Sequence, residues 1–386
     1  MKRIVILGAG YAGMAAAVSL AARTRRREDV KITVVNAEER FTERLRLHQV
    51  ASGQPLADLR IPELLRGTGV TFVRGWVTAI DADARVVRVD DERELEYDTL
   101  VYALGAVADT SAVAGADDYA YALNSQQDAE VLAQQLSGLR AGTVVVCGSG
   151  LTGVEAAAEI AERHPALDVE LVGVREPGST MGPRARAYLQ AVLGRLGVRV
   201  RSGVEIVKVA PDAVHLADGD TVPADAVLWT SGVRVSPLAA ASGLQVDERG
   251  RIVTDSALRS VSHAEVYAIG DSAAIRQSYG VMHGTCQSGM PTGVHAAASI
   301  ARELRGAEPR AFRFGYLHAP VSLGRRDAVI QFTHPDDSPK RFYLTGRPAV
   351  WYKETVSSAP WPSFGRLKQL PGIGAFAWRR GGRFTR

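Results

Sequence analysis

Short apolar blocks alternate with small-residue and polar segments along this chain. The first block, Arg3–Leu7, is apolar after its first residue, as in a strand that a parallel sheet buries on both faces. A glycine-rich turn follows, and then an alanine-rich stretch to about Thr24 that predicts a helix. A second apolar block, Lys31–Val35, completes a unit of strand, helix and parallel strand.

The same order returns later in the chain. Thr143–Cys147 predicts a second buried strand, which another glycine-rich turn, a helix over Val154–Arg163 and the strand Val169–Val172 follow. An apolar run that ends in glycine, Leu100–Gly105, also has a counterpart in Val227–Gly232. Two copies of one supersecondary order predict two nucleotide-binding domains of the same type.

The fold class that follows is α/β, with two Rossmann-like domains and the second inserted into the first. We expect residues 1–108 and 238–310 to form the first domain and residues 109–237 to form the second. Residues 311–386 are expected to form a small C-terminal α+β domain with a loosely ordered basic and aromatic end.

Three segments of the first domain lie outside this repeat. Residues 40–67 are polar and alternate in charge, which predicts helices and loops. Apolar and polar positions alternate over 70–90 and 94–104, which is typical of antiparallel strands.

Composition limits the class of protein further. Of the 386 residues, 46% are hydrophobic and 23% charged, which excludes disordered and fibrous classes. The net charge of +4 is unevenly spread, because ten basic residues and one acid lie from Lys340 onward and the rest is mildly acidic. Two cysteines, Cys147 and Cys286, exclude a disulfide framework and multi-cysteine metal sites, and no metal is expected. No apolar run approaches the ~20 residues that span a bilayer, and the sequence shows no secretion signal. We therefore expect the protein to be located in the cytoplasm.

The two Gly-x-Gly-x-x-Gly turns carry the clearest chemistry. In such a turn the first glycine permits the tight bend, the second lets the backbone approach a pyrophosphate, and the third lets the helix pack on the strand. The helix N-terminus then offers free N–H groups to the phosphates. The glycines are Gly8, Gly10 and Gly13 in the first copy and Gly148, Gly150 and Gly153 in the second.

The end of the second strand of each unit normally carries an acid that binds a ribose. Asn36 stands there in the first copy; it can donate to and accept from hydroxyls, and Glu38 or Glu39 lies close enough to substitute. In the second copy Gly173 stands there and Arg175 follows. The missing acid removes repulsion against a 2′-phosphate and the arginine could bind one, so the sequence favours NADPH without deciding between NADPH and NADH.

The segment Val266–Ala273 predicts a further strand that ends in Gly270 and Asp271 and is followed by small residues, and a carboxylate in this position can accept the hydroxyls of a polyol. Five motifs in order resemble those of the pyridine-nucleotide-dependent flavoproteins with two domains of the glutathione-reductase type. The resemblance covers roughly residues 1–332. The motifs are Gly8–Gly13, Leu100–Gly105, Gly148–Gly153 with Glu155, Trp229–Gly232 and Tyr267–Ala273.

This resemblance implies that the first copy binds FAD and the second binds NAD(P)H. It implies that Asp271 holds the ribityl chain, that Glu155 lies near the nicotinamide, and that Gly105, Gly232 and Gly270 border the cofactors. The disulfide-reductase branches and the sulfide:quinone reductases need several cysteines near the flavin, which this chain lacks. Electrons are therefore expected to leave the flavin directly, as in the similar type II NADH dehydrogenases and apoptosis-inducing-factor-like quinone reductases.

The segment Cys286–Gly293 aligns with the A-Q-x-A-x-Q-Q-G segment of those enzymes. Gln287 and Gly293 match, whereas Pro291 and Thr292 replace the pair that borders the quinone. We expect a helix to start near Pro291 with its N-terminus toward the flavin. The catalytic candidates are Glu155, Gln287 and Cys286, with Gln287 also a cofactor contact.

Other polar residues are weaker candidates. His283, His295 and His318 could line an acceptor pocket, with His283 one helical turn before Gln287, or could be structural. Arg44 or Arg46 could reach the FAD phosphates or form a solvated face.

The C-terminal stretch Phe364–Arg386 mixes aromatic and basic residues, as an interfacial membrane anchor does, although proline and glycine interrupt it. Packing against the body is the alternative, and nucleic acid is not an expected partner.

The function expected from the sequence is that of an FAD-dependent oxidoreductase that passes electrons from NAD(P)H to a quinone-like small acceptor. A reductase of a specialised metabolite, a ferredoxin-type reductase with a protein acceptor, and a non-enzymatic redox-sensing binding protein stay open as alternatives. Formation of a homodimer is a further expectation.

Overall fold

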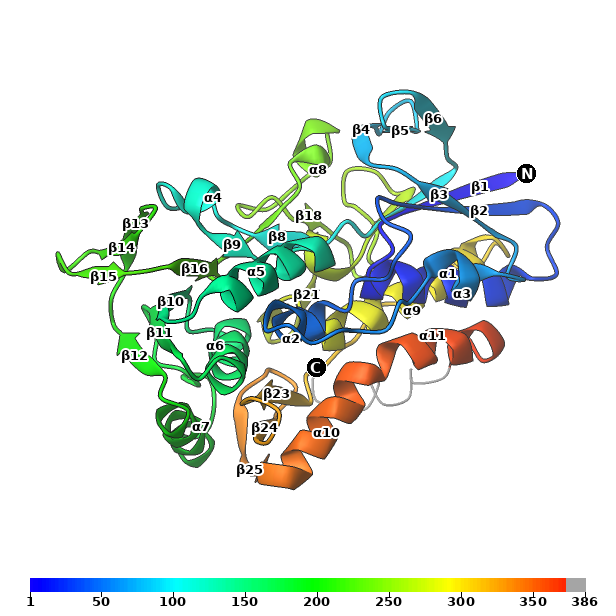
Figure 1. The fold of residues 1–386 in the computed structure, drawn as a ribbon. Helices are drawn as coiled ribbons and strands as arrows, with labels where there is room; N and C mark the ends of the chain where they lie inside the picture. Colours follow the sequence, from blue (N-terminus) through cyan, green and yellow to red (C-terminus); the bar gives the residue numbers. More distant parts are fainter. Residues whose placement is uncertain (373–386) are drawn as a thin grey trace.

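The computed structural model describes residues 1–372 and contains two parallel five-stranded sheets, with the C-terminal helices lying beneath them in the view of Figure 1. The first sheet has the strand order β19-β7-β1-β2-β3. Helices α1 and α9 pack against each other on this sheet. The bounds are β1 Lys2–Leu7, β2 Val30–Asn36, β3 Val70–Arg74, β7 Thr99–Tyr102, β19 Val266–Ala268, α1 Tyr11–Thr24 and α9 Cys286–Glu303.

The second sheet repeats this order as β12-β11-β10-β16-β9. The chain leaves the first sheet after β7 and returns to it with β19, so the second domain is inserted into the first, as the sequence predicts. The bounds are β9 Tyr121–Ala122, β10 Gly142–Cys147, β11 Leu167–Gly173, β12 Arg199–Ser202, β16 Ala226–Trp229, α5 Gln126–Gly138, α6 Leu151–Arg163 and α7 Pro183–Arg195.

The registers of the two central strand pairs are equivalent. The last residue of β1 lies opposite Val35 of β2, and the last residue of β10 lies opposite Val172 of β11. Asn36 and Gly173 therefore occupy the same position, one residue farther along, at the edge where each glycine turn begins.

The predicted antiparallel strands over 70–90 and 94–104 are only partly correct. β4, β5 and β6 form an antiparallel sheet, but β3 and β7 pair in parallel with β2 and β1. β3 alternates because it is a half-exposed edge strand, and alternation reports exposure rather than strand direction. The bounds are β4 Val77–Asp81, β5 Val86–Val89 and β6 Arg93–Glu96.

Short elements complete the two domains. Residues 40–67 form brief helices and loops, as predicted. The helical elements are η1 Arg44–Arg46, α2 Leu47–Ala51, α3 Ile61–Leu65, α4 Ala116–Tyr119, α8 Leu238–Ala241 and η2 Gly270–Ser272. The remaining strands are β8 Ala106–Ala108, β13 Ile206–Val209, β14 Ala213–Leu216, β15 Thr221–Pro223, β17 Val233–Val235, β18 Ile252–Val253, β20 Ala273–Ala274, β21 Arg276–Gln277 and β22 Gly280–Val281.

The C-terminal part is α+β and touches both nucleotide-binding domains. Its antiparallel sheet packs on α6 and α7, whereas α11 packs on α1 (Figure 1). Phe364 and Leu367, which the sequence placed in a candidate membrane anchor, are buried in the core of the first domain. The rest of that stretch from residue 373, including the predicted loosely ordered end, lies outside the described residues. The bounds are β23 His318–Ser322, β24 Ala328–Thr333, β25 Pro339–Thr345, α10 Gly346–Ser358 and α11 Pro360–Gln369.

Candidate active site

The three glycines of the first turn differ in the space around them. A Cβ on Gly8 would lie 2.4 Å from the Ala103 carbonyl oxygen, and a Cβ on Gly13 would lie 1.9 Å from the Gly8 carbonyl oxygen. A Cβ on Gly10 would meet no atom within 4 Å. The fold itself therefore requires the outer two glycines, whereas Gly10 borders open space in front of the N-terminus of α1. No side chain caps α1, so its first N–H groups are available to a phosphate.

The second turn has the same geometry. A Cβ on Gly153 would lie 1.8 Å from the Gly148 carbonyl oxygen, and Gly148 has a left-handed φ of +118°. A Cβ on Gly150 again meets nothing within 4 Å. Both turns thus present the same uncapped helix end beside an open backbone, which fits the pyrophosphates of two dinucleotides.

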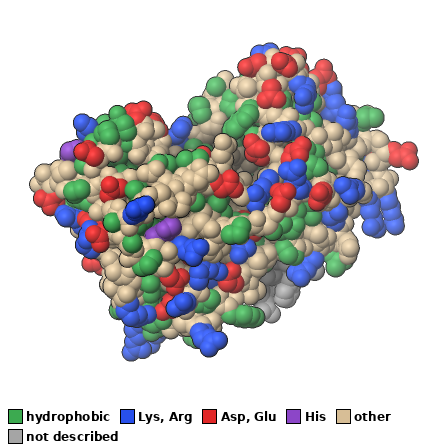
Figure 2. Space-filling view, in the orientation of Figure 1, with side chains coloured by type: hydrophobic (Ala, Val, Ile, Leu, Met, Phe, Trp, Pro, Cys, Tyr) green, Lys and Arg blue, Asp and Glu red, His purple; other side chains and the backbone are tan. Residues whose placement is uncertain are grey.

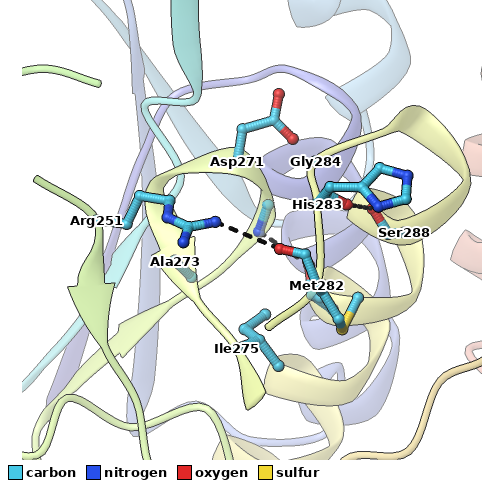
Figure 3. Close-up of a pocket in the computed structure, with 10 residues that line it drawn as sticks. Arg251, Asp271, Ala273, Ile275, Met282, His283, Gly284 and Ser288 are labelled. Carbon is cyan, nitrogen blue, oxygen red and sulfur yellow. Dashed lines mark hydrogen bonds between the residues drawn. The ribbon is translucent and has the colours of Figure 1, made fainter. Parts of the chain in front are cut away.

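Asp271 in η2 is a half-buried carboxylate without a hydrogen-bond partner among the described residues. Among residues 1–372 it accepts no hydrogen bond, and Figure 3 shows its carboxylate turned away from Arg251, which donates to the Met282 carbonyl oxygen (3.3 Å). A Cβ on Gly284 would lie 2.3 Å from Asp271 Oδ1, so only glycine permits this close approach. Burial raises the pKa of the Asp271 carboxyl. Such an unpaired acceptor fits the hydroxyls of a polyol.

The prediction that a helix starts near Pro291 is wrong, because α9 begins at Cys286. Thr285 and Ser288 form a capping box, with the Ser288 N–H donating to Thr285 Oγ1 (3.1 Å). This local signal sets the start five residues earlier and leaves Pro291 inside the helix. Cys286 and Gln287 are therefore the first two residues of α9, at its positive end.

Thr292 has a structural role that the alignment did not indicate. Its hydroxyl accepts a hydrogen bond from the Gly270 N–H (3.0 Å) and donates to the Gly289 carbonyl oxygen (2.6 Å). It is 1% exposed. Thr292 thus fixes the strand end that carries Asp271 to the first turns of α9.

Gln287 and Cys286 differ in what they can offer an acceptor. The Gln287 amide donates to the His318 carbonyl oxygen (3.0 Å) and accepts from the Leu317 N–H (2.7 Å), so it ties α9 to β23. Cys286 is half-buried, and burial raises the pKa of its thiol to about 11. It is a neutral thiol at physiological pH and not an activated nucleophile.

The three candidate histidines do not converge on one pocket. The sequence predicts His283 one helical turn before Gln287, but His283 lies in the loop before α9. Its ring stacks on that of Tyr316, with the ring centroids 4.3 Å apart. His318 Nδ1 lies 2.6 Å from the Tyr352 hydroxyl, and burial lowers the pKa of His318 to about 4. His295 packs edge-on against Phe312, with the ring centroids 5.1 Å apart.

Two arginines near the first domain's second loop are engaged by the protein. Arg44 Nη1 donates to the Ala106 carbonyl oxygen (2.7 Å), and its charge lowers the otherwise raised pKa of Asp271. Arg46 pairs with Glu43 and Glu354. Of the two, Arg44 therefore lies nearer the candidate flavin site.

A buried ion pair joins the second domain to the C-terminal part. Lys353 Nζ of α10 lies 2.6 Å from Glu155 Oε1 of α6, and the Ser322 N–H donates to the same oxygen (3.0 Å). Burial raises the pKa of Glu155, but the Lys353 charge, the nearby His48 and these hydrogen bonds outweigh it and lower the pKa overall. The ion pair is therefore charged.

This ion pair lies next to the start of α9. The charges of Lys353 and Glu155, together with that of Asp271, all act on the Cys286 thiol. His48 completes the cluster, with Nε2 3.2 Å from Ser322 Oγ, and burial lowers its pKa to about 4. Sequence reasoning found Glu155 but not its partner lysine, whose only signal is a single basic residue on the buried side of α10.

Glu159 lies one turn beyond Glu155 on α6 and is 1% exposed. It accepts a hydrogen bond from Gln54, and Arg325 Nε lies 3.9 Å from Oε1. Oε2 has no partner among the described residues. Burial raises the pKa of the Glu159 carboxyl to about 7. The cluster thus extends from the start of α9 toward Arg325. It contains two buried acids, Glu155 with a lowered pKa and Glu159 with a raised pKa.

Replacing Glu159 with glutamine is expected to remove a pH-dependent loss of stability. Because the folded-state pKa is about 7 against the usual 4.5, the folded state holds its proton more tightly, and stability falls as pH rises through this window. The free energy of unfolding of the wild type should fall by about 2.5 kcal/mol between pH 5 and 8, and that of Glu159→Gln should not show this fall. Urea unfolding of the flavin-loaded protein measures this, with the exposed Glu130→Gln as control. Parallel pH profiles for wild type and Glu159→Gln would contradict it.

Comparison with known proteins identifies the family. A model of the pyridine nucleotide-disulphide oxidoreductase family matches residues 2–300. The chain belongs to this family. It is 31% identical to an NADH dehydrogenase-like protein of Mycobacterium tuberculosis, across 93% of this chain and 94% of that protein.

Two further proteins are similar to this chain over nearly its whole length. The type II NADH:quinone oxidoreductase of Staphylococcus haemolyticus is 28% identical, across 92% and 94% of the two chains. The sulfide:quinone oxidoreductase of Aquifex aeolicus has the same fold, with a TM-score of 0.82 at 17% identity over 98% and 94% of the chains. In the part of the chain that the structure describes, no helix is both long and apolar enough to cross a bilayer.

Proposed function

We propose that this chain is an FAD-dependent oxidoreductase that takes hydride from NAD(P)H and passes the electrons to a quinone-like acceptor. One observation carries the proposal: a buried lysine–glutamate pair, Lys353 and Glu155, lies close enough to the start of α9 for both charges to act on the Cys286 thiol. The two cysteines are free, and Cys147 is buried within a strand. The name of the Staphylococcus haemolyticus relative agrees with a quinone acceptor.

The proposal assigns the two cofactors to the two glycine turns. FAD would be held by residues 1–108 and 238–310, and the nicotinamide nucleotide by residues 109–237. The FAD contacts would be Gly8, Gly10, Gly13, Asn36, Gly105, Gly270, Asp271 and Gln287. The contacts to NAD(P)H would be Gly148, Gly150, Gly153, Arg175 and Gly232.

Asn36 is already held in place for such a role. Its Oδ1 accepts from the Ala9 N–H (2.9 Å), and its Nδ2 donates to the Glu38 carbonyl oxygen (2.7 Å). The side chain thereby supports the glycine turn, and a ribose would share it with the protein.

When bound, the flavin would supply the chemistry of hydride acceptance and two-electron transfer. Net reduction of a quinone to a hydroquinone by NAD(P)H takes up one proton besides the hydride. Lys353 holds a proton at Nζ, and Glu155 fixes that ammonium in place beside Cys286. Glu155 and Lys353 are accordingly the proposed proton-handling residues, whereas Gln287 positions the start of α9.

A steady-state acceptor panel on the FAD-loaded enzyme tests this function. We expect turnover with short-chain benzoquinone and naphthoquinone acceptors and none with ferredoxin. The Pro291–Thr292 departure does not favour a specialised metabolite, since Thr292 serves the fold. Turnover with ferredoxin alone, or a failure to turn over any quinone of the panel, would contradict the proposal.

We also propose that the C-terminal face contacts a membrane surface. Trp351 and Phe342 are 72% and 60% exposed, and Arg326 and Arg347 line a depression beside Trp351. Figure 2 shows Lys and Arg side chains along the lower edge of the molecule, where β25 and α10 lie in Figure 1. Flotation with anionic against neutral vesicles tests this contact. Formation of a homodimer stays a prediction, which sedimentation equilibrium tests.

A further inference from the structure

We propose that the second nucleotide site prefers NADPH to NADH because the Arg175 guanidinium binds the 2′-phosphate of the adenosine ribose. The inference rests on the proposed function and names its reductant. It is drawn from the end of β11, where a ribose-binding acid would stand, and from the hydrogen bond and the charges that surround this end.

The position of the ribose-binding acid is vacant and closed to a side chain. Gly173 is the register equivalent of Asn36, whose amide in the first domain bonds to the glycine turn. A Cβ on Gly173 would lie 2.7 Å from Ser149 Oγ and 2.9 Å from Ser149 N. A carboxylate at this position would bind the 2′-hydroxyl of NADH and repel the 2′-phosphate of NADPH, and here the protein excludes it.

Ser149 also fixes the backbone of Arg175. Its hydroxyl, in the middle of the second glycine turn, donates to the Arg175 carbonyl oxygen. The loop after β11 is therefore held against the turn at which the pyrophosphate would bind. From this anchor the long arginine side chain starts at the edge of the site where the adenosine ribose lies in this fold.

The charge around this edge is positive. Arg175 is exposed, and within residues 1–372 no carboxylate lies within 4 Å of its guanidinium. Glu176, the one acid between residues 173 and 182, lies 3.6 Å from Arg186 Nη1 and is balanced by it. A free guanidinium next to a balanced pair favours a dianionic phosphate, which it can bind through two parallel hydrogen bonds.

Nucleotide kinetics on the FAD-loaded enzyme test the inference. We expect kcat/KM for NADPH to exceed that for NADH by about tenfold or more, a difference typical of one charge-assisted contact. Arg175→Ala should lower kcat/KM for NADPH by about 10- to 100-fold and leave kcat/KM for NADH within about twofold of the wild-type value. Arg175→Glu should abolish use of NADPH and keep NADH. Arg140→Ala, before the opposite end of β10, is the matched control and should change neither.

A binding measurement separates recognition from turnover. Calorimetry with 2′,5′-ADP should show binding that Arg175→Ala weakens by about tenfold, whereas weak binding of 5′-AMP should not change. Equal or better use of NADH by the wild type, or an equal loss with both nucleotides in Arg175→Ala, would overturn the inference. Bleaching of the flavin by NADH without a preference for NADPH overturns it and leaves the proposed function intact. Bleaching by neither nucleotide overturns the proposed function itself.

Discussion

Replacing Lys353 with methionine is expected to destabilise the flavin-loaded enzyme by about 3–5 kcal/mol and to slow acceptor reduction at least about 100-fold. The substitution leaves the Glu155 carboxylate buried without its counter-charge, 2.6 Å from where the ammonium stood. Reduction of the flavin by NAD(P)H should continue, because the glycine turns are untouched. Chemical unfolding and stopped-flow kinetics of the two half-reactions measure the two effects.

A double variant separates stability from proton handling. Glu155→Gln combined with Lys353→Met removes both charges and should recover most of the stability, since neutral replacement of a buried pair is often tolerated. Acceptor reduction should stay slow, because neither side chain then carries a proton. Normal acceptor reduction in Lys353→Met, or unchanged stability, would contradict the role given to this pair.

Gly10→Ala and Gly13→Ala are expected to fail in different ways. The alanine methyl group at position 10 meets no protein atom, so the chain should fold but bind FAD at least about 100-fold more weakly. At position 13 the methyl group would lie 1.9 Å from a carbonyl oxygen, and helix α1 must move off β1. This should cost several kcal/mol, a large share of a typical domain's stability.

Flavin absorbance and circular dichroism distinguish the two outcomes. Gly10→Ala should give folded, colourless protein that regains colour only at high FAD concentration, and Gly13→Ala should give little soluble protein. In the second domain, Gly150→Ala should keep its FAD and lose the nicotinamide nucleotide. A yellow, fully loaded Gly10→Ala protein would show that the pyrophosphate does not bind at this turn.

The sequence predicts those parts of the fold that short-range patterns determine. The glycine turns, the flanking strands and α1 all follow from contiguous residues, and each is found where predicted. The direction of β3 could not be predicted, because alternation reports which face is exposed and not which neighbour a strand pairs with. The start of α9 differs from the one that Pro291 predicts because the capping box of Thr285 and Ser288 begins the helix at Cys286.

Long-range partners are the part of the site that sequence reasoning missed. Lys353 and Glu155 are about 200 positions apart, and the packing of α10 on β23 and of β23 on α6 brings them together. The pattern that contains Phe364 and Leu367 suits a lipid surface and a protein core equally. Because α11 packs on α1, both side chains are buried in the protein core. Contiguous residues therefore predict the glycine turns proposed to bind the cofactors, whereas the residues proposed to act on the acceptor are brought together only by tertiary contacts.

The most direct test of the central claim is a sequential anaerobic stopped-flow experiment on the FAD-loaded enzyme. One equivalent of NADPH is mixed first, and one equivalent of a short-chain naphthoquinone is mixed after the flavin absorbance has bleached. The account predicts full return of the oxidised flavin spectrum at a rate no slower than steady-state turnover, with one hydroquinone formed per flavin. Flavin that stays reduced in the presence of quinone would contradict direct electron transfer to a quinone-like acceptor.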